Sequence, residues 1–255
     1  MRRYLTVFQF ILYFFSIVYS QDNKDLIYQT STITALLEGV YDGNTTFNEL
    51  KSHGNFGIGT FNNLDGEMTA LDGKFYQIKS DGKVYPVDDL QKTPFAVVTS
   101  FNEDFSFTTE KADYKKLELL INQNIPSKNL FYAVQITGKF GYVKTRSISR
   151  QSKPYPRLIE ASKLQTEFEF KNISGTLVGF RIPSFANGMN VSGFHFHFLS
   201  EDLTKGGHLL ECVLDKGKIA IDQKLSIFIQ LPSTAEFYNT NLNSDKQLEI
   251  IKIEK

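Results

Sequence analysis

One segment, residues 193–200, constrains the fold more than any other part of the chain. From Phe194 to Phe198, phenylalanine and histidine alternate strictly. This alternation is typical of a half-buried strand, because successive side chains of a strand point to opposite faces. The phenylalanines would face a core, while His195 and His197 would project together from the opposite face. We therefore expect a sheet with a pair of imidazoles on one side.

A second strand is expected to return beside the first. Gly206 and Gly207 predict a tight turn, and residues 208–214 follow with a strand-like pattern. Such a hairpin would bring His208 beside the first two histidines. Three neutral imidazoles with an open fourth position are a usual environment for a catalytic zinc or a similar divalent metal. A lone histidine on a strand is more often a surface or core residue, but three of the four histidines cluster here.

The composition favours a strand-rich globular protein. The chain has 255 residues, with 28 lysines and arginines and 28 aspartates and glutamates. This balance offers no phosphate-binding surface, so no nucleic-acid partner is expected. Phenylalanine and tyrosine number 23 and 12, and aromatic residues suit pleated sheets. The single cysteine, Cys212, is expected to be a small buried apolar residue, and it cannot supply the several thiolates of a closed structural zinc site.

Residues 1–20 have the organisation of a secretory signal peptide. Two arginines follow the first methionine, an apolar stretch runs from Tyr4 to Tyr19, and the small Ser20 precedes the expected cleavage site. The stretch is short for a membrane-spanning helix, with an uncleaved signal anchor as the alternative. We therefore expect a secreted chain that has no membrane contact after cleavage.

The order of the expected elements predicts an α+β fold with mixed or antiparallel sheets and a few short helices. Strands are expected at 25–31, 56–61, 67–71, 95–101, 130–145, 168–173, 175–182, 194–198, 208–214, 218–221 and 225–231. Helices are expected at 32–39, 46–54, 113–124 and 157–166, and residues 80–93 have the composition of a polar loop. The proline-containing run 150–156 is the expected boundary between two β-rich parts, 21–150 and 151–255. The second part carries the histidines.

Two further segments make the histidine pattern more specific. Residues 56–67 read FGIGTFNNLDGE, and residues 139–146 read KFGYVKTR. Together with the histidines, these segments resemble the alpha-acetolactate decarboxylase family, and the likeness extends from about Tyr28 to the C-terminus. The resemblance implies a zinc enzyme, usually a homodimer, that converts 2-acetolactate to acetoin and carbon dioxide. Its two β-rich parts would lie on either side of the metal site.

The resemblance also implies roles for individual residues. His195, His197 and His208 would ligate the zinc, and Glu67, Arg146 and Glu254 would be the catalytic residues. The metal would act as the electron sink for the ketone oxygen, and Arg146 would orient the substrate. A glutamate would handle the proton that is added to one face of the enediolate. Glu249 is the alternative to Glu254, because the match is least specific in the short C-terminal tail.

Each catalytic assignment has a structural alternative. Glu67 beside a turn is ordinarily solvated, and Arg146 could form a surface ion pair worth about 0–1 kcal/mol. Glu254 could be a terminal charge without a fixed place. Thr60 is a candidate pocket residue, whereas His53 lies at an expected helix end and is left outside the site.

The last residues of the chain, 248–255, are too apolar for a solvated tail. If they are extended, Ile251 and Ile253 share one face while Lys252 and Glu254 share the other. We therefore expect this tail to be docked, in a position from which Glu254 could approach the metal site.

Two functions from other classes stay open beside the decarboxylase. One is a catalytically inactive protein that binds a metal or a small polar ligand on the same scaffold. The other is a metal-dependent hydrolase, in which a zinc-bound hydroxide would attack an ester or amide. The presence of Glu67 and Arg146 together with all three histidines favours the decarboxylase.

Overall fold

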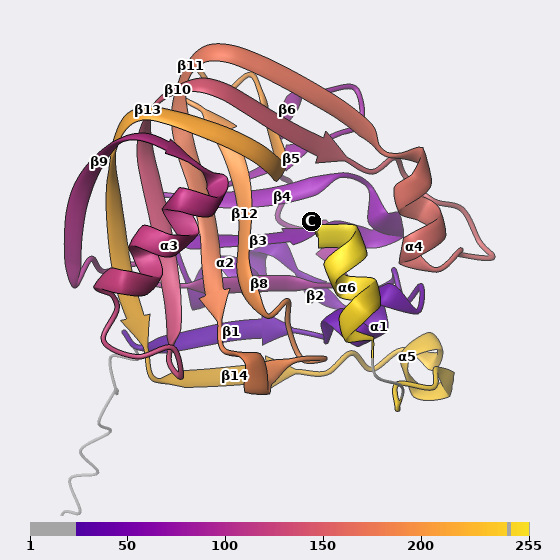
Figure 1. Cartoon of the computed structure of the whole chain (residues 1–255). Helices are drawn as coiled ribbons and strands as arrows, with labels where there is room; N and C mark the ends of the chain where they lie inside the picture. Colours follow the sequence, from indigo (N-terminus) through magenta and orange to yellow (C-terminus); the bar gives the residue numbers. More distant parts are fainter. Residues whose placement is uncertain (1–23, 244–245, 255) are drawn as a thin grey trace, which may run out of the picture.

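The structure, a computed structural model, describes residues 24–243 and 246–254. The predicted signal peptide and its cleavage site therefore lie outside the described residues. Two β-sheets pack against each other, and the strands of one run across those of the other (Figure 1). No helix in the described part of the chain is long and apolar enough to span a bilayer. The predicted α+β class, with few and short helices, is confirmed.

The first sheet has seven strands and comes mainly from the N-terminal part of the chain. Its order is β14 (Ser226–Gln230), β1 (Leu26–Thr30), β8 (Ala96–Thr99), β3 (Phe56–Thr60), β4 (Glu67–Leu71), β5 (Lys74–Ile78) and β6 (Val84–Pro86). Neighbouring strands are antiparallel except β1 and β14, which are parallel. A separate short pair joins β2 (Thr45–Thr46) to β7 (Lys92–Thr93).

The second sheet has five strands, and its pairing closes a ring. The strands β10 (Phe131–Ser147), β11 (Thr166–Ile182), β12 (Gly193–Ser200) and β13 (Gly206–Lys224) pair in that order, and β13 also pairs with β10. The strand β9 (Phe105–Asp113) pairs with β13. Strands β3 and β4 of the first sheet lie against β11, β12 and β13, so side chains from both sheets can meet in the middle of the molecule.

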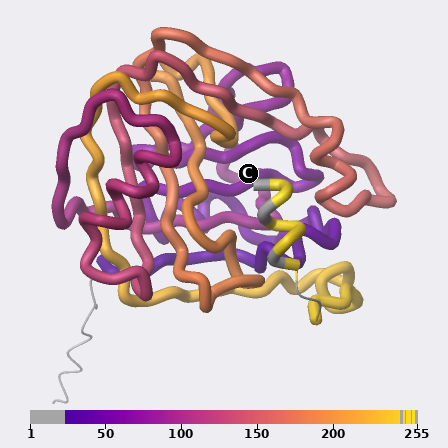
Figure 2. Tube along the Cα trace, viewed as in Figure 1, coloured from indigo at the N-terminus to yellow at the C-terminus, as the bar shows by residue number. Residues whose placement is uncertain are grey.

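Short helices complete the fold. They are α1 (Ile33–Leu37), α2 (Phe47–His53), α3 (Tyr114–Asn124), α4 (Leu158–Ala161), α5 (Ala235–Asn239) and α6 (Gln247–Glu254), with 3₁₀ turns at Asn62–Leu64, Ser162–Leu164 and Ser184–Ala186. Thr46 caps the start of α2, since its Oγ1 accepts a hydrogen bond from the backbone N–H of Glu49. The chain end returns beside the N-terminal segment, where α6 lies near α1 (Figure 2).

Apolar side chains form two large clusters. One lies between the sheets and under α1, α4 and α6. The other fills the second sheet and includes Phe194, Phe196 and Phe198. The alternation along β12 therefore has the predicted consequence: its phenylalanines enter this core, and its histidines point from the opposite face. Cys212 is buried in the same cluster as a free thiol, as predicted.

Strands from both sides of residue 150 enter both sheets. β9 and β10 precede the expected boundary but belong to the histidine sheet, and β14 follows it but belongs to the first sheet. The predicted parts 21–150 and 151–255 therefore do not coincide with the two sheets. The physical reason is that β14 covers the open edge of β1 through a parallel ladder.

The histidine hairpin turns earlier than predicted. Residues 201–205 make the turn, whereas Gly206 and Gly207 already belong to β13 and pair with β12. Close backbone approach explains the glycines, because a Cβ at Gly206 would lie 2.6 Å from the Phe198 oxygen and a Cβ at Gly207 2.6 Å from the Arg146 oxygen. Gly207 also has a φ of +134°, which side-chain-bearing residues rarely adopt.

Several other regions contain more strand than the sequence pattern indicates. No strand is predicted at β5, and the strands predicted at 208–214 and 218–221 are both part of β13. Residues 80–93, expected to be a loop, include β6 and β7, and no strand is predicted where β9 lies. The two strands predicted at 168–173 and 175–182 are one strand, β11. Gly175 does not break it, because the missing Cβ only makes room for the Leu199 oxygen of β12, which would lie 2.6 Å away.

A buried ion pair connects the end of β13 to the chain beside the ends of β1 and β8 in the first sheet. Lys224 is fully buried, and its Nζ lies 2.7 Å from Asp222 Oδ2. The same ammonium donates to the backbone oxygens of Lys24 and Ser100. Three acceptors around one buried charge satisfy it without water.

Lys224→Met is expected to lower the free energy of unfolding by about 3–5 kcal/mol, because the Asp222 carboxylate stays buried without its partner. The matched control is Lys218→Met on the same strand, which removes only a surface pair with Glu103 and should cost less than about 1 kcal/mol. Urea unfolding of both variants measures the difference. Equal losses in the two variants would contradict the structural role of Lys224.

Candidate active site and metal centre

The three predicted histidines come together on the inner face of the second sheet. His195 and His197 lie two residues apart on β12, and His208 on β13 is directly paired with His197. All three are buried, and one ring nitrogen from each lies within 4.8 Å of the others. The hairpin thus produces the cluster that the alternation in the sequence predicts, although its turn lies elsewhere.

Hydrogen bonds orient the imidazole rings. The Met68 carbonyl of β4 lies 2.7 Å from His197 Nδ1. A carbonyl can only accept, so Nδ1 carries the proton and Nε2 keeps its lone pair. His195 Nε2 and His208 Nδ1 lie 3.0 Å apart. Through this carbonyl, the first sheet holds His197 in the tautomer whose Nε2 can bind a metal.

Burial favours the neutral form of His195 and His197 by lowering the pKa of each ring. Desolvation, aided by the positive charge of Arg146, lowers the pKa of His195 to about 3. Desolvation also lowers the pKa of His197 well below its ordinary value, with the neighbouring imidazole of His195 as the next contribution. Neutral imidazole is the form that ligates divalent metals, so the site is prepared to bind a cation near neutral pH.

A carboxylate and a guanidinium lie beside the histidines. Glu67 is the first residue of β4, and Arg146 lies near the end of β10. Arg146 NH1 donates to Glu67 Oε1 at 3.1 Å, and Glu67 Oε2 lies 3.7 Å from His197 Nε2. The two residues are only 7% and 3% exposed, respectively. The structure therefore excludes a solvated Glu67 and a surface ion pair for Arg146.

These groups line a small, partly open cavity of roughly 30 Å³ between the two sheets. Its polar lining consists of Thr60, Glu67, Arg146, His195, His197 and His208. Its apolar lining consists of Ile33, Leu36, Leu64, Phe95, Ile148 and Leu158, with Gly59. The apolar side chains form a roof over the polar groups and lower the local dielectric constant, which strengthens electrostatic interactions inside the cavity.

The family sequence model described as alpha-acetolactate decarboxylase matches residues 27–244. The chain belongs to this family. An alpha-acetolactate decarboxylase from Methanosarcina mazei is 50% identical over 92% of the chain and 82% of the relative. One from Bacillus subtilis is 45% identical over 89% of the chain and 91% of the relative. The predictions of the family and of an enzyme of this class are confirmed.

Solved structures agree with the assignment to the alpha-acetolactate decarboxylase family. The crystal structure of the enzyme from Bacillus subtilis strain 168 has a TM-score of 0.88 and 44% identity, covering 90% of this chain and 98% of that one. A Staphylococcus aureus protein described as similar to alpha-acetolactate decarboxylase has a TM-score of 0.86 and 31% identity, covering 90% of this chain and all of that one. Fold and family thus agree over nearly the whole described chain.

The C-terminal tail of this family member is docked as predicted, but it is helical rather than extended. Ile250 and Ile253 share one face of α6 and are buried in the cluster under the helices. Glu254 is the last residue of α6, and its side chain lies outside what the structure describes. Glu249, its predicted alternative, binds Arg157 and Lys246 instead and is not among the residues that line the cavity.

Sequence reasoning missed the apolar roof of the cavity. Ile33 and Leu36 come from α1, and Leu158 comes from α4. A signal was present, since every residue of α1 is buried and a short helix without a polar face must be covered on all sides. His53 behaves as predicted: it lies outside the site and stacks on Tyr28 with ring centroids 3.7 Å apart.

Proposed function

We propose that the chain catalyses the zinc-dependent decarboxylation of 2-acetolactate to acetoin and carbon dioxide. One observation carries this proposal: three buried imidazoles and the Glu67–Arg146 pair converge on one small cavity. The relatives named as alpha-acetolactate decarboxylases support the choice of substrate.

The chemistry of the donors fits zinc. Zinc with Zn–N bonds of about 2.0–2.1 Å holds two nitrogens roughly 3.3 Å apart, and His195 Nε2 and His208 Nδ1 lie 3.0 Å apart. His197 would complete the set through Nε2, since its Nδ1 is bound to the backbone. Three nitrogen donors leave positions for other ligands, as catalytic zinc sites do. A bound zinc supplies a Lewis acid that polarises the ketone oxygen of the substrate.

Arg146 is suited to hold the anionic substrate. A guanidinium offers a planar fork of donors to a carboxylate and does not release its proton near neutral pH. We assign Arg146 to binding and orienting the substrate rather than to proton transfer. Its contact with Glu67 keeps it aimed into the cavity.

Glu67 is the candidate for proton handling. When the bond between C2 and the carboxylate breaks, its electron pair moves to the former ketone and gives an enediolate. The enediolate then takes one proton on carbon to form acetoin. Glu67 would first take up this proton from water. Because Arg146 holds Glu67 3.7 Å from His197 Nε2, the carboxyl group would then deliver the proton from one side, so the product should be a single enantiomer.

Glu254 is proposed as the second carboxylate, because the neighbouring Ile253 is buried in the same apolar cluster as Leu36 and Leu158, which line the cavity. Removing Glu254 and Lys255 is expected to lower kcat by about 100-fold or more, within the range of general acid–base groups. The buried residues of α6 remain, so folding and zinc content should be close to wild type. Glu249→Gln tests whether the alternative carboxylate, Glu249, has this role instead. A truncated chain with wild-type kcat would refute the role of Glu254.

The experiment that tests the proposed function supplies the zinc-loaded chain with racemic 2-acetolactate. Chiral gas chromatography follows acetoin, and evolved carbon dioxide is measured in parallel. We expect both products in equal amounts and one acetoin enantiomer. A rate no faster than the spontaneous reaction would overturn the proposal. Binding of substrate without turnover would instead support the inactive binding protein, and cleavage of simple esters would support the hydrolase.

Export and a homodimeric state are further proposals. Residues 1–20 have the pattern of a signal peptide, and the family resemblance supports the dimer. Mass spectrometry of the exported chain would show whether it begins after Ser20. Light scattering would give the mass in solution, and a monomeric mass would refute the dimer.

A further inference from the structure

Three short helices cover the metal cavity. Ile33 and Leu36 of α1 and Leu158 of α4 line it directly. Ile250 and Ile253 of α6 are buried in the same apolar cluster as these three residues. α6 and α4 are in contact, as are α4 and α1, and Figure 1 shows α6 beside the other two helices. The placement of α6 therefore affects the roof of the cavity.

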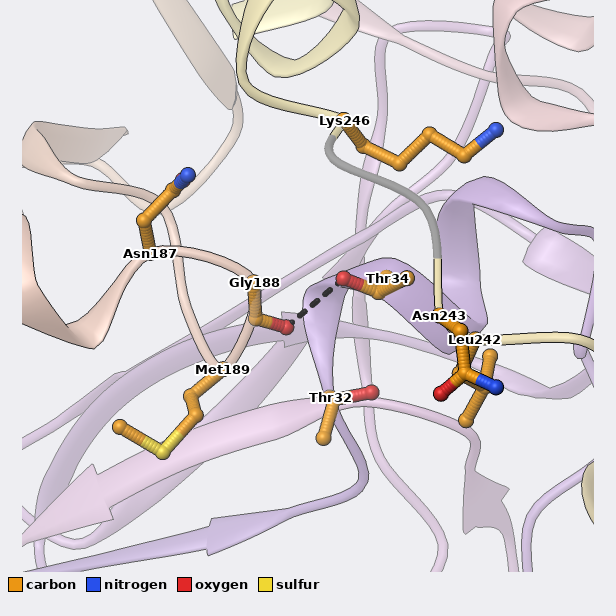
Figure 3. A pocket seen from close by; sticks show the side chains of 8 residues that line it. All are labelled: Thr32, Thr34, Asn187, Gly188, Met189, Leu242, Asn243 and Lys246. Carbon is orange, nitrogen blue, oxygen red and sulfur yellow. Dashed lines mark hydrogen bonds between the residues drawn. The ribbon is translucent and has the colours of Figure 1, made fainter.

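The N-terminal end of α1 is anchored independently of α6. Thr34 Oγ1 donates to the Gly188 oxygen at 2.9 Å, and the N–H of Ile33 donates to the Met189 oxygen at 3.0 Å. A hollow separates this anchor from the segment that leads into α6, so the 187–189 loop does not pack tightly against Lys246 (Figure 3). Contacts elsewhere must hold α6 in place.

Arg157 supplies those contacts. It caps the start of α4, and its guanidinium donates to both carboxylate oxygens of Glu38 at the end of α1, at 3.0 and 3.1 Å. The same guanidinium donates to both oxygens of Glu249 in α6, at 2.9 and 2.7 Å. Lys246 adds a contact with Glu38 at 2.7 Å. Arg157 is thus the single side chain that joins all three roof helices among the residues described.

We propose that Arg157 is a positioning residue for the decarboxylation: it fixes α6, whose last residue is Glu254, against α1 and α4. The proposal rests on the proposed function. Without Arg157, the mostly buried carboxylates of Glu38 and Glu249 face each other with only Lys246 between them. Repulsion would shift α6, and a displacement of about 1 Å in a reacting group costs roughly 100-fold in rate.

A general role in stability makes a different prediction. The Arg157 side chain is 42% exposed, and pairs of such exposure contribute about 1 kcal/mol or less to folding. A purely structural role would therefore change the melting temperature slightly and leave kcat unchanged. A positioning role lowers kcat while KM and zinc content stay close to wild type.

The test compares Arg157→Gln and Arg157→Lys in the zinc-loaded full chain. Lys163→Gln is the matched control, because it removes an exposed pair with Glu160 next to α4. We expect Arg157→Gln to lower kcat about 10- to 100-fold and to accelerate amide hydrogen exchange in α6. Arg157→Lys, which keeps the charge but loses the fork, should restore part of kcat. Wild-type kcat in Arg157→Gln, or unchanged exchange in α6, would overturn the proposal.

A second comparison separates this proposal from the role of Glu254. In a chain that lacks Glu254 and Lys255, Arg157→Gln should cause no further loss of kcat, because the group it positions is already gone. A further 10- to 100-fold loss in that background would show that Arg157 acts elsewhere and overturn the proposal. If the truncation alone left kcat at the wild-type value, Glu254 would be refuted. The positioning role proposed for Arg157 would then be refuted as well, whereas the decarboxylase activity of the chain would stand.

Discussion

His197→Ala is expected to remove metal binding and turnover together. The ring lies at the centre of the cluster, bound to Met68 through Nδ1 and directed at the cavity through Nε2. Loss of a group that only hydrogen-bonds to a metal ligand already lowers metal affinity or activity about 10- to 100-fold. Loss of the ligand itself should therefore have a larger effect. The zinc content measured by elemental analysis should fall below about one zinc per chain, and kcat should fall with it.

His53→Ala is the matched control for this prediction. His53 is the only other histidine of the chain, and it stacks on Tyr28 outside the cavity. Zinc content and kcat of this variant should equal those of the wild type. Unchanged zinc in His197→Ala would mean that the ligand set is wrong.

Glu67→Gln is expected to lower kcat by about 100- to 10,000-fold, the usual contribution of a general acid–base group. The amide has nearly the same shape as the carboxylate and can still accept from Arg146, so the buried contact should be preserved in geometry. What is lost is the charge and the capacity to transfer a proton. Steady-state kinetics and zinc analysis of the same preparation measure both consequences.

Glu167→Gln is the control for Glu67→Gln. Glu167 lies opposite Arg146 on the neighbouring strand β11, but its side chain is 42% exposed and it binds Lys144. Its replacement should change kcat less than about twofold, in line with the small energies of surface pairs. A normal kcat in Glu67→Gln would exclude Glu67 from proton transfer.

The parts of the site that follow from local periodicity could be predicted from the sequence. Alternation along 194–198 places both histidines of β12 on one face, and this holds in any sheet that buries the phenylalanines. The family resemblance added Glu67 and Arg146, and the structure brings both to the histidines.

Features that depend on contacts between distant segments could not be predicted in the same way. Gly206 and Gly207 read as a turn, yet they are strand residues required by the close approach of other backbones. The sequence of the C-terminal tail is compatible with a strand or a helix, because its four apolar residues match the periodicity of either one. The helix is stabilised by the packing of Ile250 and Ile253 in the apolar cluster with α1 and α4.

Pairing between sequence-distant strands explains the remaining differences. The edge strand β9 carries an alternating pattern of partly buried and exposed residues, but only its ladder with β13 makes it a strand. In the same way, the parallel ladder of β14 on β1 joins the two ends of the chain. Neither of these strand pairings can be predicted from the sequence of one segment alone.

The most direct test of the account is a zinc titration of the metal-free chain. The metal is removed with a chelator, zinc is added in steps, and acetoin formation from 2-acetolactate is measured at each step. We expect no turnover above the spontaneous rate without metal, a linear rise with bound zinc, and a plateau at about one zinc per chain, because three imidazoles make one site. A metal-free chain that decarboxylates 2-acetolactate as fast as the zinc-loaded chain would contradict the account.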